Sequence, residues 1–140
     1  MLKNTRQYMI EWGDCDPAGI VYYPRYFEMF DHSTTMLISA ASGVTKYQLL
    51  QKYDMAGYPM VDTRAKFMIP TRFGDTVAIE SAFTKVGNAS FDVHHQIFKD
   101  GKLCLEGFET RVWVGKDPAD PSKIKSQPIP ADLAAKFRGE

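Results

Sequence analysis

The spacing of apolar side chains changes along the chain, and the change separates a helical segment from a set of strands. Over residues 24–41, apolar residues recur every three or four positions, which is the period of an α-helix. From residue 59 onward apolar and polar residues alternate, which is typical of half-buried strands. A shorter run over residues 5–12 also indicates a strand. The pattern therefore predicts one strand, a long helix and then several strands.

The predicted helix is apolar around most of its circumference. Its apolar side chains include Tyr26, Phe27, Met29, Phe30, Leu37 and Ile38. A narrow polar stripe remains, formed by Arg25, Glu28, Asp31, His32, Thr35 and Ser39. Because a helix with so little polar surface is buried on several sides, we expect it at the centre of the fold. Gly43 is a plausible terminator, and residues 45–53 predict a second, short helix.

Four further strands are predicted in the second half of the chain. They cover about residues 59–69, 77–83, 91–97 and 103–114, with turn signals at Gly74-Asp75, Gly87-Asn88 and Asp100-Gly101. The stretch 116–127 is interpreted as a loop, so the tail 116–140 is loop-rich apart from a terminal helical turn at 131–138. One strand, a buried helix and four strands predict an α+β fold, an antiparallel sheet around a central helix.

Composition narrows the class of protein. A length of 140 residues and 44% hydrophobic residues fit a single domain, 1–140, with a substantial core. Lysine plus arginine and aspartate plus glutamate both total 17, which gives no electrostatic argument for nucleic-acid binding or a basic membrane surface. No apolar run approaches the ~20 residues that span a bilayer, and the first residues lack a signal-peptide core. With only Cys15 and Cys104, these features predict a cytoplasmic protein without a disulfide framework.

The most informative segment is Glu11–Phe27. It contains two carboxylates, Asp14 and Asp16, then a Pro-Ala-Gly turn, then apolar residues that lead to Pro24 at the start of the predicted helix. Proline is favoured at the first helical position, where its missing N–H would be unpaired in any case. The free N–H groups at a helix start can bind a developing oxyanion. A carboxylate beside such donors is what hydrolysis of an activated acyl group needs.

The run Gly13–Val21, followed by Tyr23, Pro24 and Tyr26, resembles the 4-hydroxybenzoyl-CoA thioesterase family of the hot-dog fold. More loosely, the resemblance extends to Val114. It implies a five-stranded antiparallel sheet wrapped around the long helix. It also implies a homodimer whose sheets pair edge to edge, with active sites at the interface, and further association of dimers into a homotetramer. The strand at 59–69 is our expectation for the pairing edge.

The resemblance also implies roles for particular residues. Asp16 matches the catalytic aspartate, as a nucleophile on the thioester carbonyl or as a base for water. The backbone N–H of Tyr23 would donate to the thioester oxygen, and Gly19 would let the backbone approach the acyl group. The structural alternative for Asp16 is a turn cap, since Asp before Pro-Ala-Gly is common turn chemistry.

Three further residues are expected to bind substrate. Tyr26 contributes to an aromatic pocket. Asp31 would bind the ring hydroxyl of the acyl group, although it could equally be a solvated carboxylate or one paired with a neighbouring cation. Tyr58 stands where the family has a smaller hydroxyl-bearing residue that reaches the partner's pocket, so its bulk bears on the choice of acyl group.

Other candidates are weaker. Asp14 is interpreted as a structural partner of the loop and Cys15 as packing, and no metal-ligand spacing occurs, so we expect no metal and no cofactor. His94 and His95 should lie on opposite faces of one strand. The turn at 85–90 has only Lys85 where family members carry a basic cluster for the nucleotide phosphates; Arg64, Lys66 or Arg72 could compensate.

The sequence thus predicts a homo-oligomeric acyl-CoA thioesterase that releases a carboxylate and CoA. An aromatic acyl group similar to 4-hydroxybenzoyl is favoured. The alternatives are a thioesterase for short aliphatic acyl-CoA or for acyl carrier protein, and a non-catalytic module that binds acyl-CoA.

Overall fold

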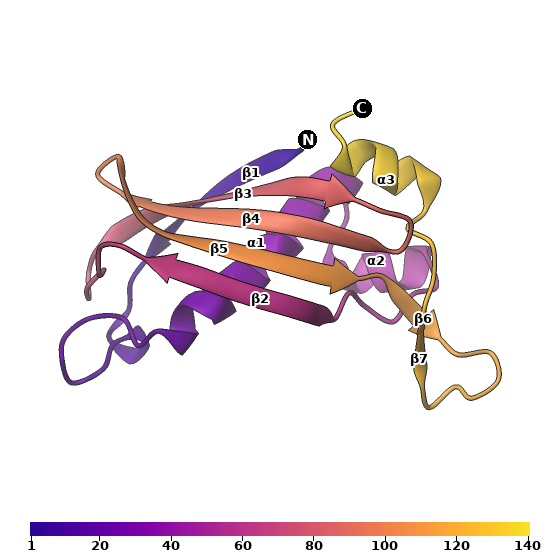
Figure 1. Ribbon diagram of the computed structural model, residues 1–140, viewed down its shortest axis with the longest axis horizontal. Coiled ribbons are helices and arrows are strands. Elements are labelled where there is room, and N and C mark those ends of the chain that lie inside the picture. Colours follow the sequence, from indigo (N-terminus) through magenta and orange to yellow (C-terminus); the bar gives the residue numbers. More distant parts are fainter.

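The computed structural model describes residues 1–140 as a five-stranded antiparallel sheet that wraps around one long helix, α1 (Pro24–Ser42) (Figure 1). The strand order is β1-β3-β4-β5-β2. These strands are β1 (Lys3–Met9), β2 (Met60–Phe67), β3 (Thr76–Val86), β4 (Ser90–Lys99) and β5 (Lys102–Val112). The α+β class and the central position of the helix are therefore as predicted.

The ends of α1 follow from local sequence. Pro24 occupies its first turn, and Gly43 ends it with a positive φ of 74° that a residue with a side chain would adopt at a cost. The Gly43 N–H donates to Ser39 O at 2.8 Å. The short helix α2 (Lys46–Lys52) follows at once, and Thr45 caps it by accepting a hydrogen bond from the Gln48 N–H.

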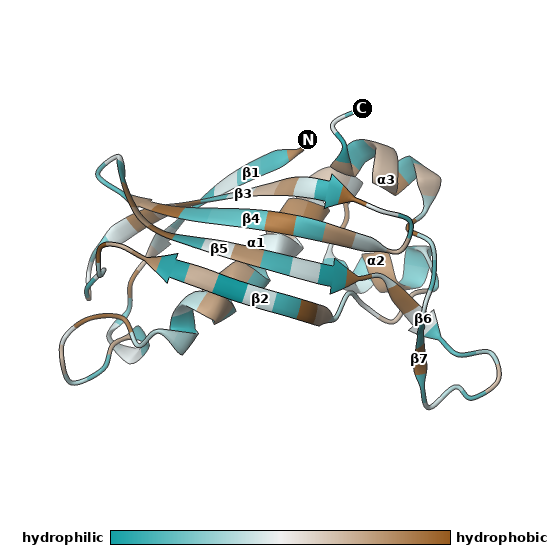
Figure 2. Cartoon of the chain, viewed as in Figure 1, coloured by the Kyte–Doolittle hydropathy of each residue, from teal (hydrophilic) through white to brown (hydrophobic).

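Apolar and polar residues alternate along the strands (Figure 2), and the alternating burial of β3, β4 and β5 places the apolar residues on the face of the sheet that α1 covers. The buried side chains form two clusters at opposite ends of the helix. The first contains Phe83, Phe91 and Trp113 and is closed by Phe137 of the C-terminal helix α3 (Ala131–Phe137). The second contains Ile10, Val21, Tyr26, Phe30 and Leu105 and lies beneath the loop that carries Asp16.

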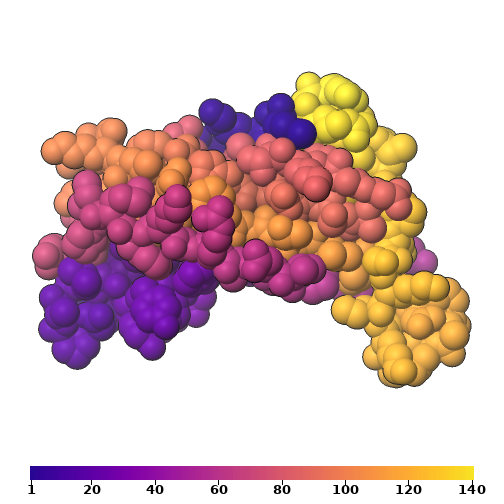
Figure 3. Space-filling model, in the orientation of Figure 1, coloured from indigo at the N-terminus to yellow at the C-terminus, as the bar shows by residue number.

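Two predictions about irregular segments were wrong. The first strand ends at Met9 rather than Trp12, because Trp12–Asp14 form a turn of 3-10 helix in which the Asp14 side chain accepts the Glu11 N–H. The stretch interpreted as loop contains a two-stranded ribbon, β6 (Val114–Lys116) paired with β7 (Ile124–Ser126). This ribbon projects from the lower right of the molecule (Figures 1 and 3).

Strand β2 is an edge of the sheet and is largely exposed. In the space-filling view it runs along the lower margin, between the Asp16 loop at one end and the ribbon at the other (Figure 3). Apolar side chains stand exposed along and just after it: Met60, Val61, Phe67, Met68 and Ile69. No helix of the chain is long and apolar enough to cross a membrane.

Candidate active site

The loop between β1 and α1 is tied to the segment that precedes β3. Gly74 N–H donates to Ile10 O at 2.9 Å, Val21 N–H donates to Thr71 O at 3.0 Å, and Ile20 forms a bridge with Arg72. Backbone hydrogen bonds at both of its ends therefore fix the loop in one conformation before it enters the helix.

Asp14 serves this loop structurally. Its Oδ2 accepts hydrogen bonds from the Tyr8 hydroxyl at 2.7 Å and from the Glu11 N–H at 2.9 Å. Burial and the hydrogen bond to Asp14 raise the pKa of Tyr8 to about 12, so the phenol stays protonated as a donor even at alkaline pH. These contacts are those of a structural partner of the loop.

Asp16 caps the Pro-Ala-Gly turn and also keeps one carboxylate oxygen unpaired. Its Oδ1 accepts the Ala18 N–H at 2.9 Å, and its main-chain carbonyl accepts the Gly19 N–H at 2.9 Å. Oδ2 accepts no hydrogen bond from the chain. Gly19 has a φ of +80°, which explains the glycine at this position. The turn cap therefore uses one oxygen of this carboxylate and leaves the other oxygen free.

The N–H of Tyr23 makes no hydrogen bond within the chain. Its neighbours are all engaged: Tyr22 N–H donates to Asp14 O, and Arg25 N–H to Tyr22 O. Pro24 has no N–H. Tyr23 is the residue that precedes the helix, where the partial positive charge of the helix dipole is concentrated, and its ring is exposed. The helix start thus offers one free, positively polarised donor.

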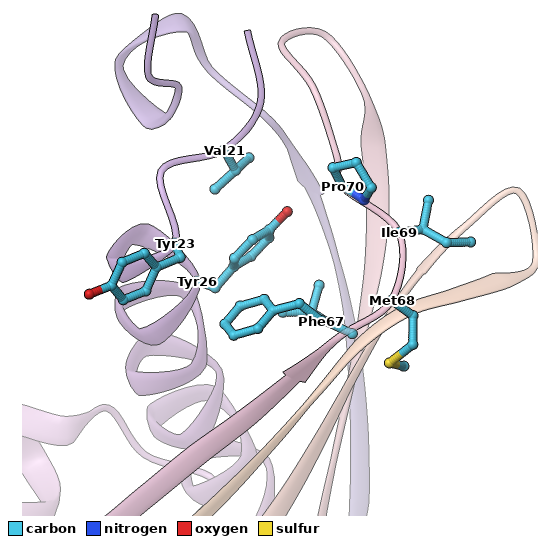
Figure 4. Close-up of a pocket in the computed structure, with 8 residues that line it drawn as sticks. Val21, Tyr23, Tyr26, Phe67, Met68, Ile69 and Pro70 are labelled. Atoms are coloured by element: carbon cyan, nitrogen blue, oxygen red, sulfur yellow. The ribbon is translucent and has the colours of Figure 1, made fainter. Parts of the chain in front are cut away.

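An apolar cavity of about 150 Å³ lies beside this donor. It is lined by Val21, Tyr23, Tyr26, Phe67, Met68, Ile69, Pro70 and Leu105 (Figure 4). The Tyr26 ring points between Val21 and Pro70, and its hydroxyl is hydrogen bonded to Thr71 Oγ1 at 2.7 Å. Asp16 follows Cys15, which bridges to the cavity residue Val21. The loop and the helix start therefore bring Asp16, Gly19, Tyr23 and Tyr26 to one region.

Asp31 and Tyr58 lie elsewhere, beside a second hollow of about 390 Å³ that is also lined by Arg111 and Met60. The Asp31 side chain is 60% exposed, and its Oδ1 accepts a hydrogen bond from Arg111 Nη2 at 2.8 Å. The Tyr58 ring is buried against Phe91 and Trp113, and its hydroxyl pairs with Thr35. Asp31 therefore presents a carboxylate to the surface, whereas Tyr58 forms the wall behind it.

A cluster of buried polar side chains that sequence reasoning did not single out supports Asp31. Within it, Glu109 accepts hydrogen bonds from Arg111 Nε and Thr34 Oγ1 and pairs with His95 Nε2. Burial alone would raise the pKa of Glu109, but the hydrogen bonds from His95 and Arg111 outweigh it and hold the pKa below its usual value. The sequence contains one signal for this cluster. Glu109 and Arg111 stand an even number of residues from the buried Leu105, so they lie on the same, buried face of the strand.

The two adjacent histidines lie on opposite faces of the sheet, and the candidate phosphate-binding cations Arg64 and Arg72 lie in different parts of the molecule. His94 lies on the outer face of the sheet, stacked on Phe108, and His95 is buried on the inner face, as predicted. Arg64 is also on the outer face, stacked on Phe108. Arg72 is near the loop that carries Asp16, since a Cβ at Gly19 would lie 3.9 Å from its Nη1.

The fold and this loop define a thioesterase of the hot-dog type. The family model described as "Thioesterase-like superfamily" matches residues 10–137, so the chain belongs to that superfamily. The 4-hydroxybenzoyl-CoA thioesterase of Pseudomonas sp. (strain CBS-3) is 28% identical over 133 residues, which cover 91% of this chain and 92% of the relative. The predicted resemblance is therefore confirmed.

Solved structures agree with this assignment. The three-dimensional structure of the 4-hydroxybenzoyl-CoA thioesterase from Pseudomonas sp. strain CBS-3 aligns with a TM-score of 0.88 at 27% identity, covering 97% of this chain and 99% of that one. A gentisyl-coenzyme A thioesterase aligns with a TM-score of 0.82, also at 27% identity, over 96% of this chain and 99% of the other. The hot-dog fold and the thioesterase class are confirmed.

Proposed function

We propose that this protein hydrolyses the thioester of a hydroxylated aromatic acyl-CoA. One observation carries the proposal. The Asp16 carboxylate, which has one oxygen free of hydrogen bonds, and the unpaired N–H of Tyr23 belong to the same short loop beside an apolar, aromatic cavity. The free carboxylate oxygen supplies a nucleophile or a base. The free N–H supplies the electrostatic stabilisation that a tetrahedral intermediate requires.

In the proposed reaction the thioester oxygen accepts the Tyr23 N–H, which is typically worth ~3–4 kcal/mol of barrier. In the nucleophilic route Asp16 adds to the carbonyl carbon, the C–S bond breaks and CoA leaves as a thiolate. Water then hydrolyses the mixed anhydride, which regenerates Asp16 and releases the acid. In the base route Asp16 removes a proton from the water that attacks the same carbon. Both routes use the same two groups.

The complete site is proposed to form between two subunits. Tyr23 and Asp31 are eight residues apart, roughly 12 Å along the helix at 1.5 Å per residue, which is longer than one aromatic ring. Antiparallel pairing of two β2 edges around a two-fold axis sets the start of one strand beside the end of the other. β2 starts at Met60, beside Asp31, and ends at Phe67, beside the cavity. Pairing thus directs Asp31 of the partner subunit toward the cavity.

Three features support the choice of acyl group. The cavity walls include Tyr26 and Phe67, whose ring centroids lie 6.0 Å apart and which suit a flat ring. Asp31 offers an unpaired carboxylate oxygen for a ring hydroxyl. The relatives act, by name, on 4-hydroxybenzoyl-CoA and gentisyl-CoA.

The assembly and the location are proposed on separate grounds. Helix α1 covers only one face of the sheet, and the uncovered face exposes part of Phe98 and Phe108, which supports association of two dimers into a tetramer. Cys15 and Cys104 are both free thiols, which suits the reducing cytoplasm.

The test is release of free thiol from 4-hydroxybenzoyl-, benzoyl-, phenylacetyl- and short aliphatic acyl-CoA. We expect turnover of the aromatic esters and a loss of about 10²–10⁴-fold in kcat for Asp16→Asn. The chain contains a matched control in Asp117-Pro118-Ala119, where Asp117 Oδ1 accepts the Ala119 N–H at 2.9 Å in the same turn geometry. Asp117→Asn should retain full activity. Turnover by Asp16→Asn within a few-fold of the wild type would refute the proposed function, and binding of acyl-CoA without turnover would indicate a non-catalytic module.

A further inference from the structure

The Asp31 carboxylate is the exposed end of a chain of hydrogen bonds that begins in the core. Ser81 Oγ lies 2.7 Å from His95 Nδ1, and His95 Nε2 lies 2.9 Å from Glu109 Oε1. Glu109 Oε2 then accepts Arg111 Nε at 2.7 Å, and Arg111 Nη2 donates to Asp31 Oδ1. Strands β3, β4 and β5 thus reach one residue of α1 through four consecutive contacts.

Such a cluster is costly in a protein core. Each buried ion loses several kcal/mol of hydration, and an apolar replacement of similar volume is often as stable. His95 is 0% exposed, and the side chains of Glu109 and Arg111 are 1% and 5% exposed. The contribution that this cluster makes to the stability of the fold therefore does not explain its presence. The contact with Asp31 indicates a second role.

We infer that Arg111 is a positioning residue for substrate selection. The inference depends on the proposed function, in which Asp31 meets the ring hydroxyl of the acyl group. Arg111 fixes one oxygen of Asp31 and leaves Oδ2 without a partner in the chain. The free oxygen is thereby held in one orientation, as an acceptor for a hydroxyl at the far end of the ring.

The geometry of Arg111 explains why it can do this. Its three nitrogens are engaged separately: Nε by Glu109, Nη1 by the Tyr58 carbonyl at 3.3 Å and Nη2 by Asp31. The planar guanidinium cannot rotate without breaking all three contacts. An exposed carboxylate on a helix surface would otherwise sample several rotamers, and ordering it would weaken substrate binding.

The deeper residues act only through Arg111. His95 is enclosed by the Phe30 ring, which stacks on it at 4.8 Å between centroids, and it has no exposed surface. The Glu109 side chain is only 1% exposed. Neither can touch a substrate, so their contribution is to hold the guanidinium plane in place.

The experiment compares 4-hydroxybenzoyl-CoA with benzoyl-CoA, which differ only in the hydroxyl. In Arg111→Met we expect KM for the hydroxylated ester to rise on the order of 10- to 100-fold, with kcat and the benzoyl-CoA constants within about threefold of the wild type. Asp31→Ala should have the same selective effect, and adding Arg111→Met to it should change the ratio of the two KM values no further. Arg111→Lys should restore part of the selectivity.

The control is Arg6→Met, because Arg6 is also partly buried and links the sheet to α1, through Ser33 and the Met29 carbonyl and without a contact to Asp31. It should leave the substrate ratio unchanged. If Arg111→Met fails to fold, the double variant Glu109→Leu/Arg111→Met removes both charges together and should show the same selective loss. Equal losses on both esters would overturn the inference while leaving the thioesterase in place. If the wild type hydrolyses neither of the two esters, the proposed function is overturned as well.

Discussion

Gly107 on β5 lies directly under the ring of Phe30 on α1. A Cβ built on Gly107 would come within 2.5 Å of Phe30 Cε2, a separation that real Cβ atoms essentially never show. The same ring stacks on His95 with an interplanar angle of 8°. The glycine therefore sets how closely the helix approaches the sheet, and the position of the buried polar cluster depends on it.

Gly107→Ala should lower the free energy of unfolding by ~1–3 kcal/mol, because the added methyl group must displace Phe30 in a packed core. Urea denaturation followed by circular dichroism measures the change. Gly13→Ala is the control, since a Cβ at Gly13 meets no atom within 4 Å. A variant at Gly107 as stable as the wild type would mean that the helix can shift without cost.

Tyr26→Phe should destabilise the protein by about 1 kcal/mol without changing the shape of the cavity. The hydroxyl is buried, pairs with Thr71 Oγ1 and also accepts the Thr71 N–H at 3.3 Å. Its removal leaves these groups without their partner. Tyr47→Phe is the control, because Tyr47 is largely exposed. Denaturation midpoints for both variants give the comparison, and equal midpoints would contradict the role of the hydroxyl.

Local sequence was sufficient to predict the helix and the main strands. The start of α1 is encoded by Pro24 and its end by Gly43, so both limits were predicted within a residue. The ribbon of β6 and β7 could not be predicted in this way, because each strand has only three residues and depends on pairing with the other. The end of β1 was missed because Trp12 continues the alternation, whereas the side chain of Asp14 imposes a turn.

The site was predictable only where it is contiguous in sequence. Asp16, Gly19 and Tyr23 lie within eight residues, so one motif was enough to propose them as candidates. The contact between Asp31 and Arg111 joins residues 80 positions apart, and no local pattern encodes it. Tyr58 is a second example, because no local pattern indicates that its ring packs in the hydrophobic core of its own chain.

Val61→Lys should weaken the proposed dimer. Val61 is 62% exposed on the edge strand β2, and a lysine at this position would place a charge in the seam between two paired β2 edges. Sedimentation velocity should show a shift from dimer or tetramer toward monomer. Ile124→Lys is the matched control, because Ile124 is 59% exposed on the ribbon away from the β2 edge. A smaller effect at Val61 than at Ile124 would exclude β2 as the pairing edge.

Glu109→Gln should destabilise the protein by ~3–5 kcal/mol at pH 7, because it removes the buried counter-ion of Arg111 and leaves only the exposed carboxylate of Asp31. This difference should depend on pH. The pKa of Glu109 in the folded protein lies below its ordinary value of 4.5, so the unfolded chain binds more protons in the interval between the two values. Its stabilisation is therefore complete above the unfolded pKa and is lost as pH falls through the folded one.

Unfolding free energies of the wild type and Glu109→Gln, measured by urea denaturation from pH 7 down to pH 3, should converge below about pH 4.5. The control is Glu140→Gln, which removes an exposed carboxylate paired with Arg138 at the C-terminus and should follow the wild type at every pH. A constant gap between wild type and Glu109→Gln across this range would show that folding leaves the pKa of Glu109 unchanged. The ion pair between Glu109 and Arg111 would then add no net stability to the fold.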